Sequence, residues 1–294
     1  MNRISLRLLL VAVVALAFSG SGLASQASAR TYVPSFSEVK RDKGPVFREG
    51  CLIYTNRVTS PACRYGVVGS EKKVTVLGDS HALQWTPALI EIARKRGWEL
   101  TMLLRANCTA AIVNVNRPCN RWRQNALKRV AREKPALVFV ASNTARNTYV
   151  MRGGKRLSRT ASEPIFRKGM YRSLLRLRRT GAQVTVMRDL PMSPGFLPSD
   201  CVARNRNSPG RCTFPARRPL SESYDLAAAK RLKAVQVIDP LPKVCPRRKC
   251  RAVHGNVLKY RDRGHVSATY SRLLTGWLNA RLQDPFPVPA PGSA

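Results

Sequence analysis

The sequence predicts an α/β fold built on a central parallel β-sheet, with helices on both faces and with loops held by disulfide bonds. Short apolar runs alternate with longer amphipathic stretches through most of the chain. Such alternation is typical of parallel strands joined by crossing helices. The 294 residues are enough for one large domain of this class. Eight cysteines fall in four close pairs, which indicates loops closed by disulfides.

The first 29 residues have the features of a signal peptide. Arg3 and Arg7 form a positive start, residues 8–18 are an apolar run that is short for a membrane span, and small residues at 27–29 fit a cleavage site. We therefore expect cleavage near Ala29 and a secreted or extracytoplasmic protein, associated with the cell wall or periplasm. An uncleaved signal anchor is the alternative.

The expected elements follow the local pattern along the chain. Residues 30–70 lack sustained periodicity and are interpreted as an N-terminal extension clamped onto a domain at 71–283. Short β-rich apolar runs predict strands at 73–77, 98–104, 137–141, 183–188 and 235–238. Amphipathic stretches predict helices at 83–96, 122–133, 165–180, 224–233 and 268–282. Residues 284–294 hold four prolines and are interpreted as a Pro-rich tail.

Residues 191–220 have no clear period and are rich in Pro, Ser and Arg. An irregular segment of this length inside a compact domain is usually a functional loop or a disordered one. Its arginines make it a candidate contact surface for an anionic partner.

The cysteines predict four local disulfides. Eight cysteines allow many pairings. We predict that each cysteine pairs with its nearest neighbour in sequence, because each such pair encloses a segment with few apolar residues to pack it against the domain. Closing a loop of roughly a dozen residues stabilises the fold by about 3 kcal/mol in the chain-entropy model. No CxxC occurs and histidines are few, so a zinc site is not favoured and no metal is expected. The predicted pairs are Cys51–Cys63, Cys108–Cys119, Cys201–Cys212 and Cys245–Cys250.

The charge of the chain is strongly positive. The formal net charge is +36, and it is +34 for residues 30–294 because residues 1–29 hold two arginines and no acid. Such a field attracts polyanions. The chain is expected to be exported, and it has no basic motif interspersed with aromatic residues of the RNA-binding kind. We therefore expect anionic wall polymers, glycans or lipid head groups as partners, and we expect no nucleic acid. Arginines that only solvate the surface are the alternative.

Two short blocks near the ends of the predicted domain supply a nucleophilic triad. Gly78-Asp79-Ser80 follows the first predicted strand, and Asp262 stands three residues before His265. A serine hydroxyl needs an imidazole to take its proton, and the imidazole needs a partner that fixes its tautomer. The offset of three lets one turn bring the carboxylate under Nδ1 and leaves Nε2 facing the serine. We predict Ser80 as the nucleophile, His265 as its base and Asp262 as the group that orients the base.

The two other histidines fit the role of base less well. His81 adjoins Ser80 in sequence, and neighbouring side chains rarely align for proton transfer, so we interpret it as a helix-start or substrate-contact residue. His254 lies in a turn-like run with no carboxylate close by. A surface-loop position is the better interpretation for it.

An acyl-transfer site also needs donors for the oxyanion of the tetrahedral intermediate. The backbone N–H of Ser80 is the first candidate. The loop around Asn107, after the strand at 98–104, would bring a second N–H. Asn143 follows the strand at 137–141 and would add a side-chain amide, with a turn residue capping the strand as the alternative.

Several blocks of the sequence resemble one subgroup of proteins. The resemblance covers roughly residues 51–282. It rests on the blocks Gly78-Asp79-Ser80-His81-Ala82, Trp85 with Pro87-Ala88-Leu89, Cys108, Cys119 with Trp122-Arg123, Cys245, Cys250, Gly255-Asn256-Val257-Leu258, Tyr260, Asp262, His265 and Ser267. The chain resembles the extracytoplasmic SGNH domain found fused behind the membrane part of bacterial acyltransferase-3 proteins.

This resemblance implies an SGNH hydrolase fold, which is a flavodoxin-like three-layer α/β sandwich, and a link to O-acylation of envelope polysaccharides. The family's triad carries over to Ser80, Asp262 and His265. Asn107 stands where the family has a glycine, which keeps a backbone N–H but changes the loop. The multi-span membrane half, which hands over the acyl group in the fused proteins, is missing. Either a separate membrane acyltransferase supplies the acyl donor, or the chain is an esterase with water as acceptor.

We therefore expect an exported SGNH-type serine enzyme that transfers or hydrolyses short O-acyl esters, O-acetyl foremost, on cell-envelope glycans. The reaction passes through an acyl-enzyme on Ser80 and needs no metal or organic cofactor. The alternative is a catalytically silent basic protein that binds the cell wall or another polyanion on the same fold.

Overall fold

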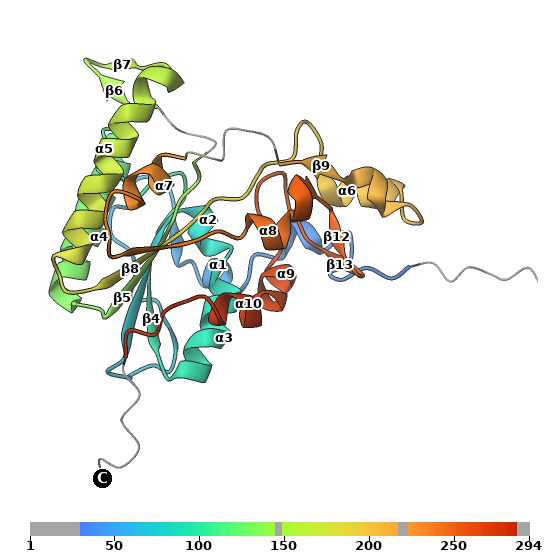
Figure 1. Cartoon of the computed structure of the whole chain (residues 1–294), viewed down its shortest axis with the longest axis horizontal. Coiled ribbons are helices and arrows are strands. Elements are labelled where there is room, and N and C mark those ends of the chain that lie inside the picture. The colour runs from blue at the N-terminus through green and yellow to red at the C-terminus, as the bar shows by residue number, and fades with distance from the viewer. Residues whose placement is uncertain (1–29, 145–148, 217–222, 287–294) are drawn as a thin grey trace, which may run out of the picture.

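The computed structural model describes residues 30–144, 149–216 and 223–286, and it shows a sheet between two layers of helices (Figure 1). Five central strands are parallel and lie in the order β4-β3-β5-β8-β10. This is the flavodoxin-like order 2-1-3-4-5, so the predicted α/β sandwich is confirmed. The strands of the main sheet are β1 (Leu52–Ile53), β2 (Arg64–Gly66), β3 (Lys73–Gly78), β4 (Glu99–Arg105), β5 (Leu137–Ala141), β8 (Gln183–Met187) and β10 (Val235–Ile238).

Three further pairs of short strands form small two-stranded antiparallel sheets outside the main one. They are β6 (Met151–Arg152) with β7 (Lys155–Arg156), β9 (Phe214–Pro215) with β11 (Lys249–Cys250), and β12 (Val253–His254) with β13 (Val257–Leu258).

The helices cover both faces of the sheet, and each face has its own apolar core. On one face α3, α9 and α10 pack around Trp85 and Trp98, and on the other α4, α5 and α7 pack around Trp122 and Phe166. The α-helices are α1 (Pro45–Arg48), α2 (Ser80–Leu83), α3 (Thr86–Arg96), α4 (Arg117–Glu133), α5 (Arg159–Arg178), α6 (Pro198–Arg204), α7 (Tyr224–Ala229), α8 (Leu241–Val244), α9 (Ala268–Leu273) and α10 (Thr275–Asn279). Short 3₁₀ turns lie at Val39–Arg41, Pro209–Cys212 and Pro246–Arg248.

Local capping explains where the long helices begin. The side chain of Asn116 accepts a hydrogen bond from the Cys119 N–H at 2.8 Å, so α4 begins at Arg117, five positions before the predicted start at 122. Ser158 caps α5 in the same way, and that helix begins at Arg159 rather than at 165. The predicted strands at 137–141 and 235–238 have the observed bounds.

Three further predicted helices and one predicted irregular segment differ from the structure in their extent. The helix predicted at 83–96 corresponds to α3, which begins at Thr86 with Pro87 in its first turn, where a missing N–H costs least, whereas Leu83 ends the preceding short helix α2. The helix predicted at 268–282 is divided into α9 and α10, and the one predicted at 224–233 ends at Ala229. The segment at 191–220 is not irregular throughout, since it contains α6 and β9; its residues 217–220 lie outside the described residues.

The stretch at 30–70 contributes to the main sheet. β1 pairs with β4 in parallel and β2 pairs with the same strand in antiparallel, so a division at residue 70 passes through one sheet. The stretch also clamps the C-terminal part of the chain. The backbone carbonyl and the side chain of Asp42 accept hydrogen bonds from Ala268 at 2.9 Å and Thr269 at 2.8 Å, which begin α9.

The four predicted cysteine pairs are joined as disulfides in the structure, which confirms the stapled loops. Their Cα–Cα separations are 6.0, 5.5, 5.7 and 4.2 Å in chain order. The predicted signal peptide and most of the predicted tail lie outside the described residues. Within the ranges that the structure covers, no helix combines the length and apolar character that a membrane crossing requires.

Candidate active site

Ser80 stands where β3 turns into α2, at the carboxyl edge of the sheet. Gly78 makes the turn possible: its φ is +156°, and a Cβ there would overlap the carbonyl oxygen of Ala141 on the neighbouring strand β5. Only glycine fits such an approach. Asp79 then caps α2, because its Oδ1 accepts a hydrogen bond from the His81 N–H at 2.8 Å. The Gly-Asp-Ser block thus fixes the backbone that presents the serine.

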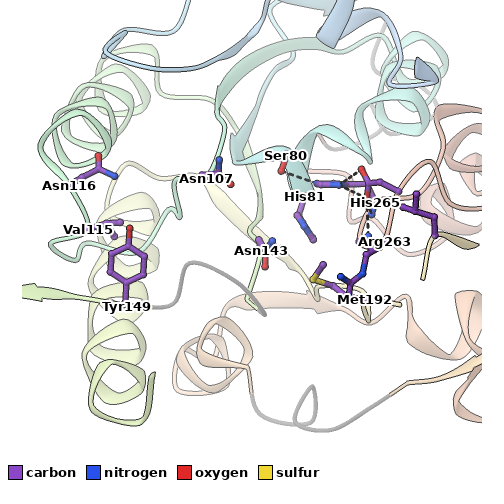
Figure 2. Close-up of a pocket in the computed structure, with 13 residues that line it drawn as sticks. Ser80, His81, Asn107, Val115, Asn116, Asn143, Tyr149, Met192, Arg263 and His265 are labelled. Atoms are coloured by element: carbon purple, nitrogen blue, oxygen red, sulfur yellow. Dashed lines mark hydrogen bonds and ion pairs between the residues drawn. The ribbon is translucent and has the colours of Figure 1, made fainter. Parts of the chain in front are cut away.

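The structure brings together the three predicted triad residues (Figure 2). The Nε2 of His265 lies 2.9 Å from the Oγ of Ser80, although the two residues are 185 positions apart. The Nδ1 of His265 lies 2.8 Å from the Oδ2 of Asp262. The Oδ1 of Asp262 also accepts the backbone N–H groups of Gly264 and His265, each at 2.8 Å. One turn therefore holds acid and imidazole in the arrangement that the offset of three predicts.

The electrostatics keep the base uncharged and its partner ionised. Burial acts to raise the pKa of Asp262, but the hydrogen bond and charge of His265 and the Gly264 N–H outweigh it and hold that pKa below its usual range. Burial and the positive charge of His81 lower the pKa of His265 to about 4, against the opposing effect of Asp262. His265 is then neutral at pH 7 and able to accept a proton from Ser80.

The three predicted oxyanion residues line one pocket of about 630 Å³ together with the triad. Asn107 follows β4 with a left-handed φ of 56°, a conformation that asparagine tolerates better than most residues. Asn143 follows β5, and its N–H donates to the Oδ2 of Asp79 at 2.9 Å. In Figure 2, Asn107 and Asn143 lie on the side of Ser80 away from His265. The pocket stands at the point where the strand order reverses around β3, which is where ligands bind in such sheets.

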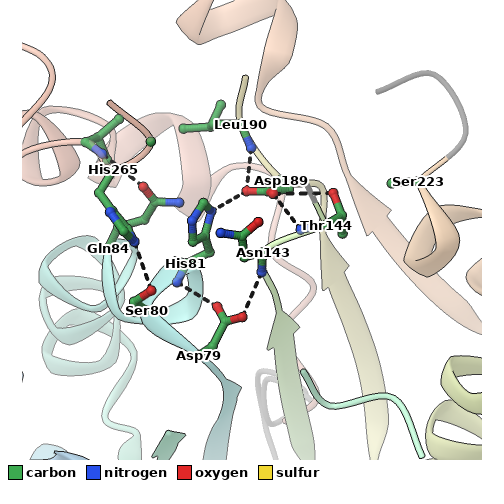
Figure 3. A network of polar contacts seen from close by, with 12 residues as sticks. Asp79, Ser80, His81, Gln84, Asn143, Thr144, Asp189, Leu190, Ser223 and His265 are labelled. Carbon is green, nitrogen blue, oxygen red and sulfur yellow. Dashed lines mark hydrogen bonds and ion pairs between the residues drawn. The ribbon is translucent and has the colours of Figure 1, made fainter. Parts of the chain in front are cut away.

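A second histidine–carboxylate pair lies behind the triad, and the sequence interpretation missed it (Figure 3). The Nδ1 of His81 lies 2.5 Å from the Oδ1 of Asp189, and both side chains are buried. Asp189 also accepts the N–H groups of Leu190 and Thr144, each at 2.8 Å. Burial disfavours a charged imidazole, but the Asp189 carboxylate outweighs it and raises the pKa of His81.

The two imidazoles are in contact. The ring centroids of His81 and His265 lie 4.4 Å apart, and no described group accepts a hydrogen bond from the buried Nε2 of His81. Sequence distance hid this pair, because 108 positions separate His81 from Asp189. Asp189 does follow the predicted strand at 183–188, and that position at the carboxyl end of a parallel strand is the one signal that could have indicated it.

Two contacts hold the loop that carries His265. The Oε1 of Gln84 accepts the N–H of Val266 at 2.9 Å, which ties the loop to α2. The Ser193 N–H donates to the Arg263 carbonyl at 2.7 Å, and the Arg263 guanidinium donates to the Ser193 carbonyl at 3.1 Å. These two hydrogen bonds tie the loop to the segment after β8. The base is therefore supported from both sides.

His254, the remaining histidine, lies exposed on β12, in agreement with its interpretation as a surface residue. Within the described residues, no three His, Cys, Asp or Glu side chains are grouped as metal ligands would be.

Comparison with known proteins places this geometry in context. A family model described as "SGNH domain (fused to AT3 domains)" matches residues 50–278. The periplasmic domain of a lipopolysaccharide acetyltransferase from Salmonella ser. Paratyphi A is similar in structure, with a TM-score of 0.55, 13% identity, and coverage of 83% of this chain and 93% of that chain. That similarity shows a shared fold.

Two other solved structures resemble the chain more distantly. A carbohydrate acetylesterase from Sinorhizobium meliloti has a TM-score of 0.45 and 14% identity, covering 71% of this chain and 97% of that chain. A GDSL-like lipase from Bacteroides thetaiotaomicron has a TM-score of 0.43 and 13% identity, covering 84% of this chain and 97% of that chain. No curated protein sequence matches this chain significantly.

Proposed function

Because this chain belongs to the family of SGNH domains found fused to AT3 domains, we propose that it is a serine enzyme acting on short O-acyl esters, O-acetyl foremost, of cell-envelope glycans. One observation carries the proposal. Ser80, His265 and Asp262 form a continuous hydrogen-bonded chain of 2.9 and 2.8 Å in a pocket of about 630 Å³. An acetyl substrate is further supported by the Salmonella domain of similar fold, which is named as a lipopolysaccharide acetyltransferase.

The proposed reaction begins with attack of the Ser80 Oγ on the acyl carbonyl carbon. The Nε2 of His265 takes the serine proton, while Asp262 holds the Nδ1–H and stabilises the imidazolium. In this proposal the backbone N–H groups of Ser80 and Asn107 and the side-chain amide of Asn143, which line the same pocket, donate to the oxyanion. Each such donor typically contributes about 2.7–4 kcal/mol to lowering the barrier.

Collapse of the tetrahedral intermediate breaks the bond to the leaving alkoxide, which takes its proton from His265, and leaves an acyl group on Ser80. The acceptor hydroxyl, from a sugar or from water, then gives its proton to His265 and attacks the acyl carbon. His265 returns that proton to Ser80 as the new ester or acid leaves. All proton transfers use one imidazole.

Export and an external acyl donor belong to the same proposal. Four disulfides are favoured by an oxidising compartment, which supports an extracytoplasmic enzyme released after cleavage near Ala29. If the chain is a transferase, a separate membrane acyltransferase supplies the acyl group. If it is an esterase, water accepts it.

The test is turnover of 4-nitrophenyl acetate by the purified protein, with and without envelope glycan. We expect release of 4-nitrophenol and an acetyl adduct on Ser80 in intact-mass and peptide spectra. Ser80→Ala should lower turnover by about 10³-fold or more, whereas the exposed Ser208→Ala should leave it unchanged. Acetylated glycan identifies a transferase, and free acetate alone identifies an esterase. Equal turnover by wild type and Ser80→Ala would refute the proposal and favour the catalytically silent binding protein.

A further inference from the structure

A second hollow, of about 450 Å³, opens between α4 and α5 beside the active-site pocket. We call it the basic groove. Its floor is partly apolar, and three exposed arginines stand around it. Its lining includes Asn120, Gln124, Leu127, Arg152, Arg172 and Arg176 and, on the side of the active-site pocket, Asn114 and Val150.

Among the described residues, no carboxylate forms an ion pair with the three exposed arginines of the basic groove. Glu133 and Glu163 are the only acidic residues between positions 101 and 188 of the sequence. Glu133 pairs with Arg129 at 2.7 Å, away from the groove. In the parts of the chain that the structure describes, Arg152, Arg172 and Arg176 have no carboxylate partner; Arg172 donates only to the Ile112 carbonyl, at 3.1 Å. Arginines at a hollow that pair with no carboxylate keep their positive charge available for a bound anion.

The basic groove adjoins the active-site pocket across one ridge. Val115, Asn116 and Tyr149 line the pocket on the wall opposite the triad (Figure 2), and their chain neighbours Asn114 and Val150 line the groove. A polymer that places one sugar at Ser80 can therefore extend over this ridge into the groove.

The ridge is firmly built. Asn114 and Met151 exchange two hydrogen bonds, from the Met151 N–H at 2.8 Å and from the Asn114 side chain at 3.0 Å. Behind it, the Ile112 N–H donates to the Gly169 carbonyl of α5 at 3.1 Å, and any Cβ at Gly169 would meet the Ile112 backbone. The distance between pocket and groove is thus set by the fold.

We propose that the basic groove binds an anionic sugar of the same glycan whose ester occupies the active-site pocket. The planar forks of the arginines pair with the carboxylate of a uronic acid or with a phosphodiester. Gln124 and Asn120 supply amides for hydroxyl groups, and Leu127 supplies apolar surface for the face of a sugar ring. The part of this proposal that puts the ester of the glycan at Ser80 rests on the proposed function. The binding of an anionic glycan in the basic groove does not depend on it.

The experiment measures binding of three labelled polymers of matched length, oligogalacturonate, a glycerol-phosphate oligomer and neutral dextran, and of duplex DNA of the same charge as the anionic oligomers. It compares three variants that each remove three positive charges. The groove variant is Arg152→Gln with Arg172→Gln and Arg176→Gln. The variant on the opposite face of the sheet is Arg94→Gln with Lys95→Gln and Arg272→Gln. The variant in the segment at 191–220 is Arg204→Gln with Arg206→Gln and Arg211→Gln.

We expect the groove variant to weaken binding of at least one anionic polymer by about tenfold or more. The two other variants should weaken it by less than about threefold, through the reduced net charge alone. The anionic polymer whose binding the groove variant loses shows whether carboxylate or phosphate is the recognised group. Neutral dextran should bind weakly to the wild type and to all three variants. Melting temperature and turnover of 4-nitrophenyl acetate should be the same in the groove variant as in wild type.

Three results would overturn the inference: equal losses in all three variants, a loss confined to the variant at 204–211, or equal affinity of wild type for duplex DNA of the same charge. Ser80→Ala separates this inference from the proposed function. Ser80→Ala should bind the anionic polymer as tightly as wild type does. If the wild-type protein shows no esterase activity but its polymer binding still depends on the three groove arginines, the proposed enzymatic function is refuted and the inference about the basic groove stands.

Discussion

We expect kcat/KM for 4-nitrophenyl acetate to hold its plateau down to about pH 5 and to fall only near pH 4, because His265 must be neutral to take the proton of Ser80. Burial and the neighbouring charge of His81 lower the pKa of His265 to about 4. At pH 5.5 a base of that pKa is about 97% neutral, whereas a base with the ordinary pKa of about 6.5 is about 9% neutral. The two cases differ about tenfold in activity at that pH.

Removing the charge beside His265 should move this acid limb. The His81 ring lies 4.4 Å from the His265 ring and is held next to Asp189, which raises the pKa of His81. His81→Gln should shift the limb upward from pH 4, but not to the ordinary value, because burial still disfavours the charged His265. Asp189→Asn should shift it in the same direction, since His81 then loses the carboxylate that favours its charged form.

The assay is a pH series of kcat/KM from pH 3.5 to about 8, with circular dichroism at each pH to confirm that the protein stays folded. Asp200→Asn, on α6 outside the pocket, is the matched control and should leave the limb in place. A role of His81 in packing alone would lower the plateau without moving the limb. A wild-type limb near pH 6.5, or one that His81→Gln does not move, would refute the reasoning.

Other predictions concern the triad, the strand turn and the disulfides. Asp262→Asn should leave weak residual turnover, about 10³- to 10⁴-fold below wild type, because the imidazole loses the partner that fixes its tautomer; kcat unchanged within threefold would contradict this. Gly78→Ala should lower the free energy of unfolding by about 3 kcal/mol or more, measured in urea, whereas Gly276→Ala, which faces open space, should cost little. Loss of the Cys108–Cys119 bond should lower stability by about 3 kcal/mol, and peptide mapping without reduction should return four local loops rather than any long-range link.

The candidate triad could be predicted from the sequence because its essential relation is local. An aspartate three residues before a histidine places both side chains on one turn whatever surrounds them, and a Gly-Asp-Ser block after an apolar strand indicates an exposed serine at a sheet edge. Few histidines narrowed the choice of base. The meeting of Ser80 with His265, 185 positions apart, has no local signal; it was expected from the need of a serine nucleophile for an imidazole base and from the resemblance to SGNH domains.

The cysteine pairs and the central strands were predictable for a similar reason. Each disulfide closes a loop of a dozen residues or fewer, and a short loop brings its ends together at little entropic cost. The strands at 137–141 and 235–238 are bounded by turn-forming residues, so their limits are visible in the sequence. Helix starts were less predictable, because capping side chains such as Asn116 and Ser158 lie before the apolar pattern begins.

The sequence alone therefore determined the α/β class, the stapled loops and the pairing of Asp262 with His265, all of which depend on periodicity or on residues close along the chain. The tertiary structure decided the rest: the pairing of His81 with Asp189, the addition of β1 and β2 to the sheet, and the basic groove between α4 and α5. Each of these joins segments far apart in sequence, and their contact depends on strand order and helix packing. No local pattern specifies that order, because it is set by how the buried faces of the whole chain fit together.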